Sequence, residues 1–264
     1  MRSKFSAWKQ HRFFATGEAI FWGALVGLVA AAVMHFAWPL GIGNVPTKQM
    51  AQAAKASGVK QITRFADFGN ELPSTDAKQV ADWVADSGDS GGVEFVIVDK
   101  KQARLYVFDA SAHLQGASPI LLGGARGDDS VPGIGSKPLA AIPEEERTTP
   151  AGRFVAELGR NILNEDVVWV DYDAAVSMHR VRTTNPTERR LERLATLSIE
   201  DKRISWGCIN VPVAFFEKYV EPIFLAKKAI VYVLPDIKTV AQVFGQYSFA
   251  ASAGTQAAQG RAAI

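Results

Sequence analysis

The first sustained apolar segment of the chain runs from Ala19 to Leu40 and contains no Asp, Glu, Lys or Arg. Its 22 residues suffice for a membrane-crossing helix, which takes about 20 apolar residues. The segment is also longer than the apolar core of a cleavable signal peptide, which spans about 7–15 residues. Basic residues precede it at Arg2, Lys4, Lys9 and Arg12. The positive-inside rule therefore predicts a cytoplasmic N-terminus at 1–18, a single transmembrane anchor at 19–42 and an extracytoplasmic location for the rest.

Residues 43–92 have no sustained apolar period and are predicted to form a stalk or linker. Two short helices are expected within it, at 48–56 and 76–85. The second helix has a clear start signal, because hydroxyl and carboxylate side chains at 74–76 can cap its first turn. The Gly- and Ser-rich segment 87–92 then indicates a flexible connection to the next part of the chain.

From Val93 the pattern changes to short β-branched and aromatic runs. The runs 94–98 and 104–108 flank a polar turn, which is the pattern of a β-hairpin. Further strands are predicted at 119–122, 153–158, 166–176 and 229–234, and helices at 186–197 and 213–226, the latter interrupted by Pro222. The segment 93–236 is therefore predicted to be a mainly β domain of the α+β kind. Residues 237–264 are rich in Ala, Gly and Gln without periodicity, which predicts a disordered tail.

Composition adds two informative facts, the net charge and the number of cysteines. The chain has 29 basic and 27 acidic residues, so its net charge of +2 gives no reason to expect a nucleic-acid partner. It has a single cysteine, Cys208, which cannot form an internal disulfide and must be an inert core residue, an intermolecular link or a reactive thiol. The predicted compartment is oxidising, so a lone thiol retained there favours a chemical role.

Cys208 lies in the hexapeptide Ser-Trp-Gly-Cys-Ile-Asn at 205–210. A thiol attacks carbonyl groups as the thiolate, and a neighbouring imidazole is its usual activator. Three of the four histidines are poorly placed for this role: His11 before the apolar segment, His35 inside it and His113 in a predicted turn. The remaining one, His179, ends a β-rich run, so the sequence predicts a Cys208–His179 pair.

The neighbours of the thiol suggest supporting roles. Gly207 would let backbone N–H groups approach a developing oxyanion. Ser205 is expected to hydrogen-bond the imidazole or the substrate. Asn210 either orients substrate carbonyl groups or caps the turn before Pro212. One cysteine and two extracytoplasmic histidines do not make a zinc site, so no metal is expected.

These residues resemble the catalytic motif of the L,D-transpeptidase (YkuD-type) family, in which Ser-x-Gly-Cys-hydrophobic-Asn follows a histidine on a strand. The stretch Thr149–Phe154 is similar to the family's Thr-Pro-x-Gly-x-Phe segment, and Gly133–Gly135 precedes it in the same order. The resemblance covers roughly residues 93–236.

The resemblance implies a β-sandwich-like catalytic domain that uses no metal or organic cofactor. It implies that Cys208 attacks a tetrapeptide stem of peptidoglycan, releases D-alanine and passes the acyl group to an amine, with His179 as general base. The expected partners are peptidoglycan stems and, through 19–42, a bacterial inner membrane, with the catalytic domain in the periplasm. Two alternatives are a hydrolase with the same Cys–His site and a catalytically silent wall-binding protein.

The chain departs from the family pattern at three places. Trp206 stands where the family often has His or Arg, and it either packs or forms a wall of the substrate cleft. The histidine and cysteine are 29 positions apart, which leaves a charged insert at 185–203. That insert is either a solvated helix or a lid whose arginines bind stem carboxylates. Arg180 replaces a commonly small residue after the histidine and is a further candidate for orienting substrate.

Overall fold

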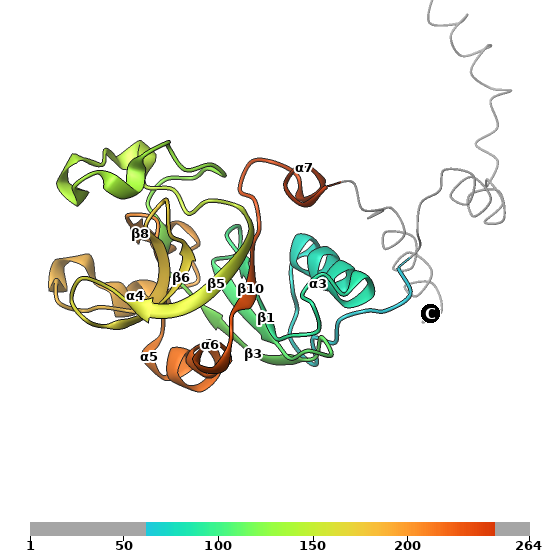
Figure 1. Ribbon diagram of the computed structural model, residues 1–264. Helices are drawn as coiled ribbons and strands as arrows, with labels where there is room; N and C mark the ends of the chain where they lie inside the picture. The colour runs from blue at the N-terminus through green and yellow to red at the C-terminus, as the bar shows by residue number, and fades with distance from the viewer. Residues whose placement is uncertain (1–61, 246–264) are drawn as a thin grey trace, which may run out of the picture. The chain divides into compact units, whose positions relative to one another are not determined.

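The computed structural model in Figure 1 describes residues 62–245. The predicted N-terminal segment 1–18, the anchor 19–42 and the helix at 48–56 lie outside the described residues, as does the chain after 245. Across residues 62–245, every helix is too short or too polar to cross a membrane.

The described chain is mainly β, as predicted. Eight strands form one sheet in the order β3-β2-β1-β10-β5-β6-β7-β9, and the other two strands of this region pair as β4-β8. The strands are β1 Phe95–Asp99, β2 Arg104–Phe108, β3 Leu114–Pro119, β4 Leu122–Gly123, β5 Gly152–Arg160, β6 Asp166–Asp171, β7 Val176–Arg180, β8 Arg203–Ser205, β9 Ile209–Val211 and β10 Ala229–Val233.

The central strands are apolar along their whole length because both of their faces are covered. On β1, Val96 and Val98 point into one core, and Phe95 and Ile97 point into another. Successive side chains of a strand point to opposite faces, so a strand buried on both sides reads as a continuous apolar run. The predicted hairpin is confirmed, since β1 and β2 pair antiparallel from Phe95–Phe108 onward.

The first core lies between the sheet and the helical segment 213–226. This segment consists of α5 (Val213–Phe215), a π-helical stretch (Phe216–Val220) and α6 (Glu221–Ala226). Phe216, Val220 and Phe224 are buried against the sheet. The proline predicted to interrupt this helix directly follows the π-helical stretch and lies in the first turn of α6.

The second core lies on the other face, beneath α3 (Thr75–Ser87) and α7 (Val240–Phe244). Ser74 caps α3 by accepting a hydrogen bond from the N–H of Ala77 at 3.0 Å, so the helix predicted at 76–85 is present. The ring of Trp83 packs edge-on against Tyr232 at 5.8 Å, and Phe244 contacts the same tryptophan. The compact domain therefore begins before the predicted boundary at 93 and continues past 236.

The third strand begins earlier than predicted. β3 occupies Leu114–Pro119, whereas the predicted strand at 119–122 contributes only the last residue of β3 and the first residue of the short β4. β3 is a sheet edge without an apolar alternation, so its sequence carries no strand signal. Gly116 lies against the ring of Phe215, and a side chain there would begin 3.0 Å from that ring.

The sheet curves around the first core. The long strand β5 pairs with β10 along its first half and with β6 along its second half, and it joins the two parts of the sheet (Figure 1). Leu121, just after edge strand β3, exchanges two backbone hydrogen bonds with Asn210 of edge strand β9, at 2.8 and 2.9 Å. The expected sandwich is thus one curved, barrel-like sheet. Its point of closure is two residues from Cys208.

Candidate active site

The parallel pairing of β7 with β9 places the site. Met178 pairs with Ile209, and both side chains are buried in the first core. The next pair in register is His179 with Asn210. Because side chains alternate along a strand, His179 and Asn210 point to the opposite face, away from that core.

The structure brings the predicted thiol and imidazole together. Cys208 immediately precedes β9, and its Sγ lies 3.7 Å from Oγ of Ser177 and 3.8 Å from the carbonyl oxygen of Ala175. Burial by itself raises the pKa of the Cys208 thiol, but the imidazole of His179 and the hydroxyl and N–H groups of Ser177 outweigh it. The pKa of this thiol therefore lies below its ordinary value, which increases the thiolate fraction near neutral pH.

The orientation of the imidazole ring follows from one backbone contact. Nδ1 of His179 lies 2.8 Å from the carbonyl oxygen of Arg180. A carbonyl oxygen only accepts hydrogen bonds, so Nδ1 carries the proton and Nε2 is left as the basic nitrogen. The ring is therefore held in the tautomer that can accept the thiol proton.

The turn that carries the thiol is held by Ser205 and Gly207. The buried hydroxyl of Ser205 donates to the carbonyl of Cys208 at 2.6 Å and accepts from the N–H of Gly207 at 3.1 Å. Ser205 borders the cleft, but both hydrogen bonds of its hydroxyl serve the turn and neither goes to the imidazole. Gly207 has a φ of +121°, and a Cβ there would lie 2.8 Å from the carbonyl oxygen of Thr148. Glycine is needed here for backbone geometry, and its own N–H donates to Ser205.

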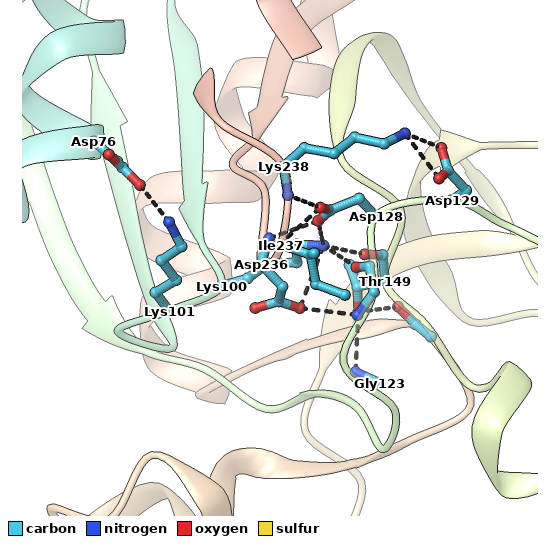
Figure 2. Close-up of polar contacts among 12 residues, drawn as sticks. Asp76, Lys100, Lys101, Gly123, Asp128, Asp129, Thr149, Asp236, Ile237 and Lys238 are labelled. Atoms are coloured by element: carbon cyan, nitrogen blue, oxygen red, sulfur yellow. Dashed lines mark hydrogen bonds and ion pairs between the residues drawn. The ribbon is translucent and has the colours of Figure 1, made fainter. Parts of the chain in front are cut away.

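Thr149 supports this turn from behind. Its buried hydroxyl donates to the carbonyl of Gly207 at 2.8 Å and accepts from the N–H of Gly123 at 2.9 Å. Its own carbonyl accepts from Nζ of Lys100 at 2.8 Å (Figure 2). The Thr-Pro-x-Gly-x-Phe stretch therefore contributes a residue that positions the nucleophile's backbone.

Lys100 is fully buried at the centre of the polar cluster in Figure 2. Its ammonium group also donates to the carbonyl of Gly127 at 2.5 Å and to Asp128 at 3.0 Å, and lies 3.4 Å from Asp236. Burial lowers the pKa of Lys100, and the two carboxylates oppose that shift. Burial raises the pKa of Asp128, but backbone N–H groups at 236–238 and Lys100 lower it to about 2.

Arg180 does not reach the cleft that holds Cys208. As the neighbour of His179 on β7 it points to the other face, where its guanidinium lies 4.7 Å above the ring of Phe216. It donates there to Glu217 at 3.1 Å and to Glu221 at 2.9 Å. The expectation that its side chain orients substrate at Cys208 therefore needs correction, because only its backbone carbonyl contributes, through His179.

Trp206 both packs and forms a wall of the cleft. Its Nε1–H donates to the carbonyl of Leu139 at 3.1 Å, and the guanidinium of Arg147 lies 4.9 Å from its ring. These contacts attach the nucleophile's turn to the segment of short 3-10 helices at 134–146. The indole also borders the cleft beside Cys208.

The cleft has a volume of about 510 Å³ and contains both predicted catalytic side chains. Asn210 is fully buried at its base, where its amide donates to the carbonyl of Cys208 at 3.2 Å and its oxygen accepts from Arg190 at 2.5 Å. Asn210 therefore stabilises the nucleophile's backbone. An apolar wall faces these polar groups and consists of Ile134, Leu139, Ile142, Ile162, Trp169 and Trp206.

The charged insert at 185–203 is anchored to the domain. Its helix α4 is shorter than predicted, Arg190–Ala195, and the buried ammonium of Lys202 binds three carbonyl groups at its C-terminal end at 2.6–2.8 Å. One side of α4 is exposed at Leu191, while Arg190 turns inward and borders the cleft. The insert thus has features of both predicted alternatives.

The described residues also include His113 and the side chains that could act as metal ligands. His113 is largely exposed, lies 3.3 Å from Asp109 and does not border the cleft. Within residues 62–245, no three His, Cys, Asp or Glu side chains are grouped so that they could hold a metal ion.

Comparison with known proteins gives weak likenesses. No family model matches the chain, and no curated protein matches it. The L,D-transpeptidase from Xylanimonas cellulosilytica DSM 15894 is 12% identical with a TM-score of 0.33, over 70% of this chain and 69% of that one. The helical cell shape determining protein Pgp2 from Campylobacter jejuni is 19% identical with a TM-score of 0.36, over 56% of this chain and 49% of that one. The L,D-transpeptidase from Mycobacterium smegmatis is 13% identical with a TM-score of 0.30, over 53% and 58%.

Sequence reasoning missed three supporting residues of the site. Ser177 stands two positions before His179, so strand alternation would have placed it on the same face. Arg182, which borders the cleft, follows from the same rule only if the extended chain continues past β7. Lys100 lies in the polar hairpin turn, and nothing in the sequence distinguishes it from an exposed turn lysine.

Proposed function

We propose that the domain is a cysteine acyltransferase of the L,D-transpeptidase type that acts on peptidoglycan stem peptides. The observation that carries the proposal is the thiol of Cys208 beside the imidazole of His179 in an open cleft, with its pKa held below the ordinary value. The two sequence stretches that resemble the family also meet at this thiol, because Thr149 holds the carbonyl of Gly207. The resemblance supplies the substrate class.

In the proposed reaction, Nε2 of His179 takes the thiol proton of Cys208, and the thiolate attacks the carbonyl carbon of the third stem residue. The C–N bond to the terminal D-alanine breaks, and the imidazolium returns the proton to the departing amine. An amine of a second stem then attacks the thioester. His179 takes the proton of that amine and passes it to the released thiolate, leaving a 3→3 cross-link and free D-alanine as products.

We further propose that the domain works outside the cytoplasm, tethered to the inner membrane by residues 19–42. The apolar segment and the basic residues before it support this arrangement. Protease treatment of spheroplasts that produce the full-length protein tests it. External protease is expected to degrade the domain, and full protection until lysis would contradict the proposed location.

The reaction is tested by incubating the full-length protein with a synthetic stem tetrapeptide and recording its intact mass. The expected result is a tripeptide adduct on Cys208 with release of D-alanine, and no adduct on Cys208→Ala. An added amine acceptor should yield a cross-linked peptide. Hydrolysed tripeptide as the only product would indicate a hydrolase. Binding to isolated peptidoglycan without any adduct would indicate a catalytically silent wall-binding protein.

A further inference from the structure

The lining of the cleft carries more basic than acidic side chains, although the whole chain is almost neutral. Three basic side chains, Lys137, Arg182 and Arg190, line it with a single acidic one, Glu188. Lys137 is paired with Glu146 at 2.6 Å and Arg190 with Glu188 at 2.5 Å, which leaves Arg182 as the least compensated positive charge of the cleft. Charge of one sign inside a cleft raises the local concentration of an oppositely charged substrate.

Of the two arginines that line the cleft, Arg182 is the more available to a ligand. It follows the histidine strand by two residues, and 38% of its side chain is exposed. Its ion pair within the described chain is a loose one, 3.6 Å from an oxygen of Glu165, which is itself 47% exposed. A guanidinium has five N–H donors in a planar fork that matches a carboxylate. A ligand can therefore displace Glu165 at little cost.

Arg190 is held in a fixed orientation. Only 10% of its side chain is exposed, and its Nε and one terminal nitrogen donate to Glu188 and to Asn210, each at 2.5 Å. Since the amide of Asn210 also holds the carbonyl of Cys208, this arginine couples the insert to the nucleophile's backbone. Its charge is balanced by Glu188, so its contribution is to hold the insert and Asn210 in place.

We propose that Arg182 is a carboxylate-binding site that selects the acyl donor. This inference rests on the proposed function and adds the chemistry by which the donor is recognised. In a stem tetrapeptide, a carboxylate next to the scissile amide has two sources. One is the C-terminal D-alanine, and the other is the side chain of the third residue when that residue is a diamino dicarboxylic acid. A lysine stem lacks the second.

Three donors separate these sources in the full-length protein: a meso-diaminopimelate tetrapeptide, the same peptide with the side-chain carboxylate amidated, and the same peptide ending in D-alaninamide. The measurement is the second-order rate constant for acylation of Cys208. Wild type is expected to lose about 10–100-fold with one of the amidated donors, as for a charged hydrogen-bonded pair. In Arg182→Gln the unmodified donor should fall to that level, so that the discrimination disappears. Arg182→Lys should restore part of it.

Arg160→Gln is the matched control, because Arg160 is 60% exposed, is paired with Asp166 at 3.3 Å and does not border the cleft. This variant should discriminate like wild type. Alkylation of Cys208 by the neutral reagent iodoacetamide should proceed equally in all variants, which shows that the thiol and imidazole are intact.

An unchanged discrimination ratio in Arg182→Gln, or equal rates for all three donors in wild type, would overturn the carboxylate site alone. If iodoacetamide alkylates Cys208 but no donor forms an adduct, the proposed function itself is overturned and the carboxylate site with it.

Discussion

Two strands of the curved sheet, β1 and β7, use the same alternation of side chains for different purposes. On β1, Phe95 and Val96 point to opposite faces and both are buried in cores. On β7, Met178 is buried in the first core, while His179 on the other face is only partly covered and borders the cleft. The proposed catalytic pair therefore lies where a strand has one packed face and one uncovered face.

The two regions are also held in place differently. Strand β1 is stabilised by non-directional packing between the sheet and helices on both sides. The turn at Cys208 is held by directional hydrogen bonds from Ser205, Thr149 and Asn210 to its carbonyl groups. Packing tolerates small shifts, whereas a catalytic pair has to be fixed within a fraction of an ångström. Substitutions near β1 and at the turn that carries Cys208 are therefore expected to have different effects.

The largest effect is expected at the uncovered face. His179→Ala removes the base and should slow acylation of Cys208 about 10²–10⁴-fold, with little change in the free energy of unfolding. His113→Ala is the control, because that histidine is exposed and outside the cleft. The measurement is the acylation rate by intact mass. An unchanged rate in His179→Ala would show that the imidazole does not activate the thiol.

The second largest effect is expected at Lys100, on the free energy of unfolding. Lys100→Met leaves the buried Asp128 without its cation and Asp236 with Arg203 alone, so we expect a loss of about 3–5 kcal/mol in the free energy of unfolding. Lys238→Met removes an exposed pair with Asp129 and should cost less than about 1 kcal/mol. Chemical denaturation measures both. Equal effects of the two substitutions would mean that the buried cluster does not stabilise the domain.

Substitution of two glycines with positive φ, Gly207 and Gly88, separates backbone strain at the candidate active site from backbone strain elsewhere. Gly207→Ala puts a Cβ 2.8 Å from the carbonyl oxygen of Thr148 and should shift the turn, at a cost of about 1–3 kcal/mol, and slow acylation at least tenfold. Gly88→Ala, at the end of α3 with open space around it, should cost about 1 kcal/mol and leave the acylation rate unchanged. Equal acylation rates in the two variants would contradict the role of Gly207.

A smaller effect is expected on the stability of the folded domain in acid. The pKa of Asp128 is about 2 in the folded protein, below its ordinary value of about 3.9 in an unfolded chain. A lowered folded-state pKa gives stability that is present above the unfolded pKa and lost as the pH falls through the folded one. Between pH 4 and pH 2, wild type should therefore lose about 1–2 kcal/mol more than Asp128→Asn. Parallel stability curves for the two proteins would contradict this.

The sequence predicted the parts of the fold that depend on strong local patterns. The hairpin of β1 and β2, the helix after Ser74 and the mainly β class all follow from apolar runs and capping residues. The Cys208–His179 pair followed from elimination, and the structure places these two residues together. The short strand β9 was not predicted, because it has too few residues to show a period.

The remaining site residues depend on contacts between distant segments. Lys100 contacts Thr149 across 49 positions and Asp236 across 136, and no local pattern encodes such meetings. The direction of Arg180 follows from alternation, but only once its position on β7 is known. The sequence therefore specifies the reactive groups more readily than the groups that position them.

The most direct test of the Cys208–His179 pair is the pH dependence of Cys208 alkylation by iodoacetamide. The thiolate is the reactive form, so a lowered pKa keeps the reaction fast at lower pH. We expect a midpoint below the ordinary thiol value of about 8.5 in wild type and in His113→Ala, and a higher midpoint in His179→Ala. A midpoint near the ordinary value in all three proteins would contradict the account.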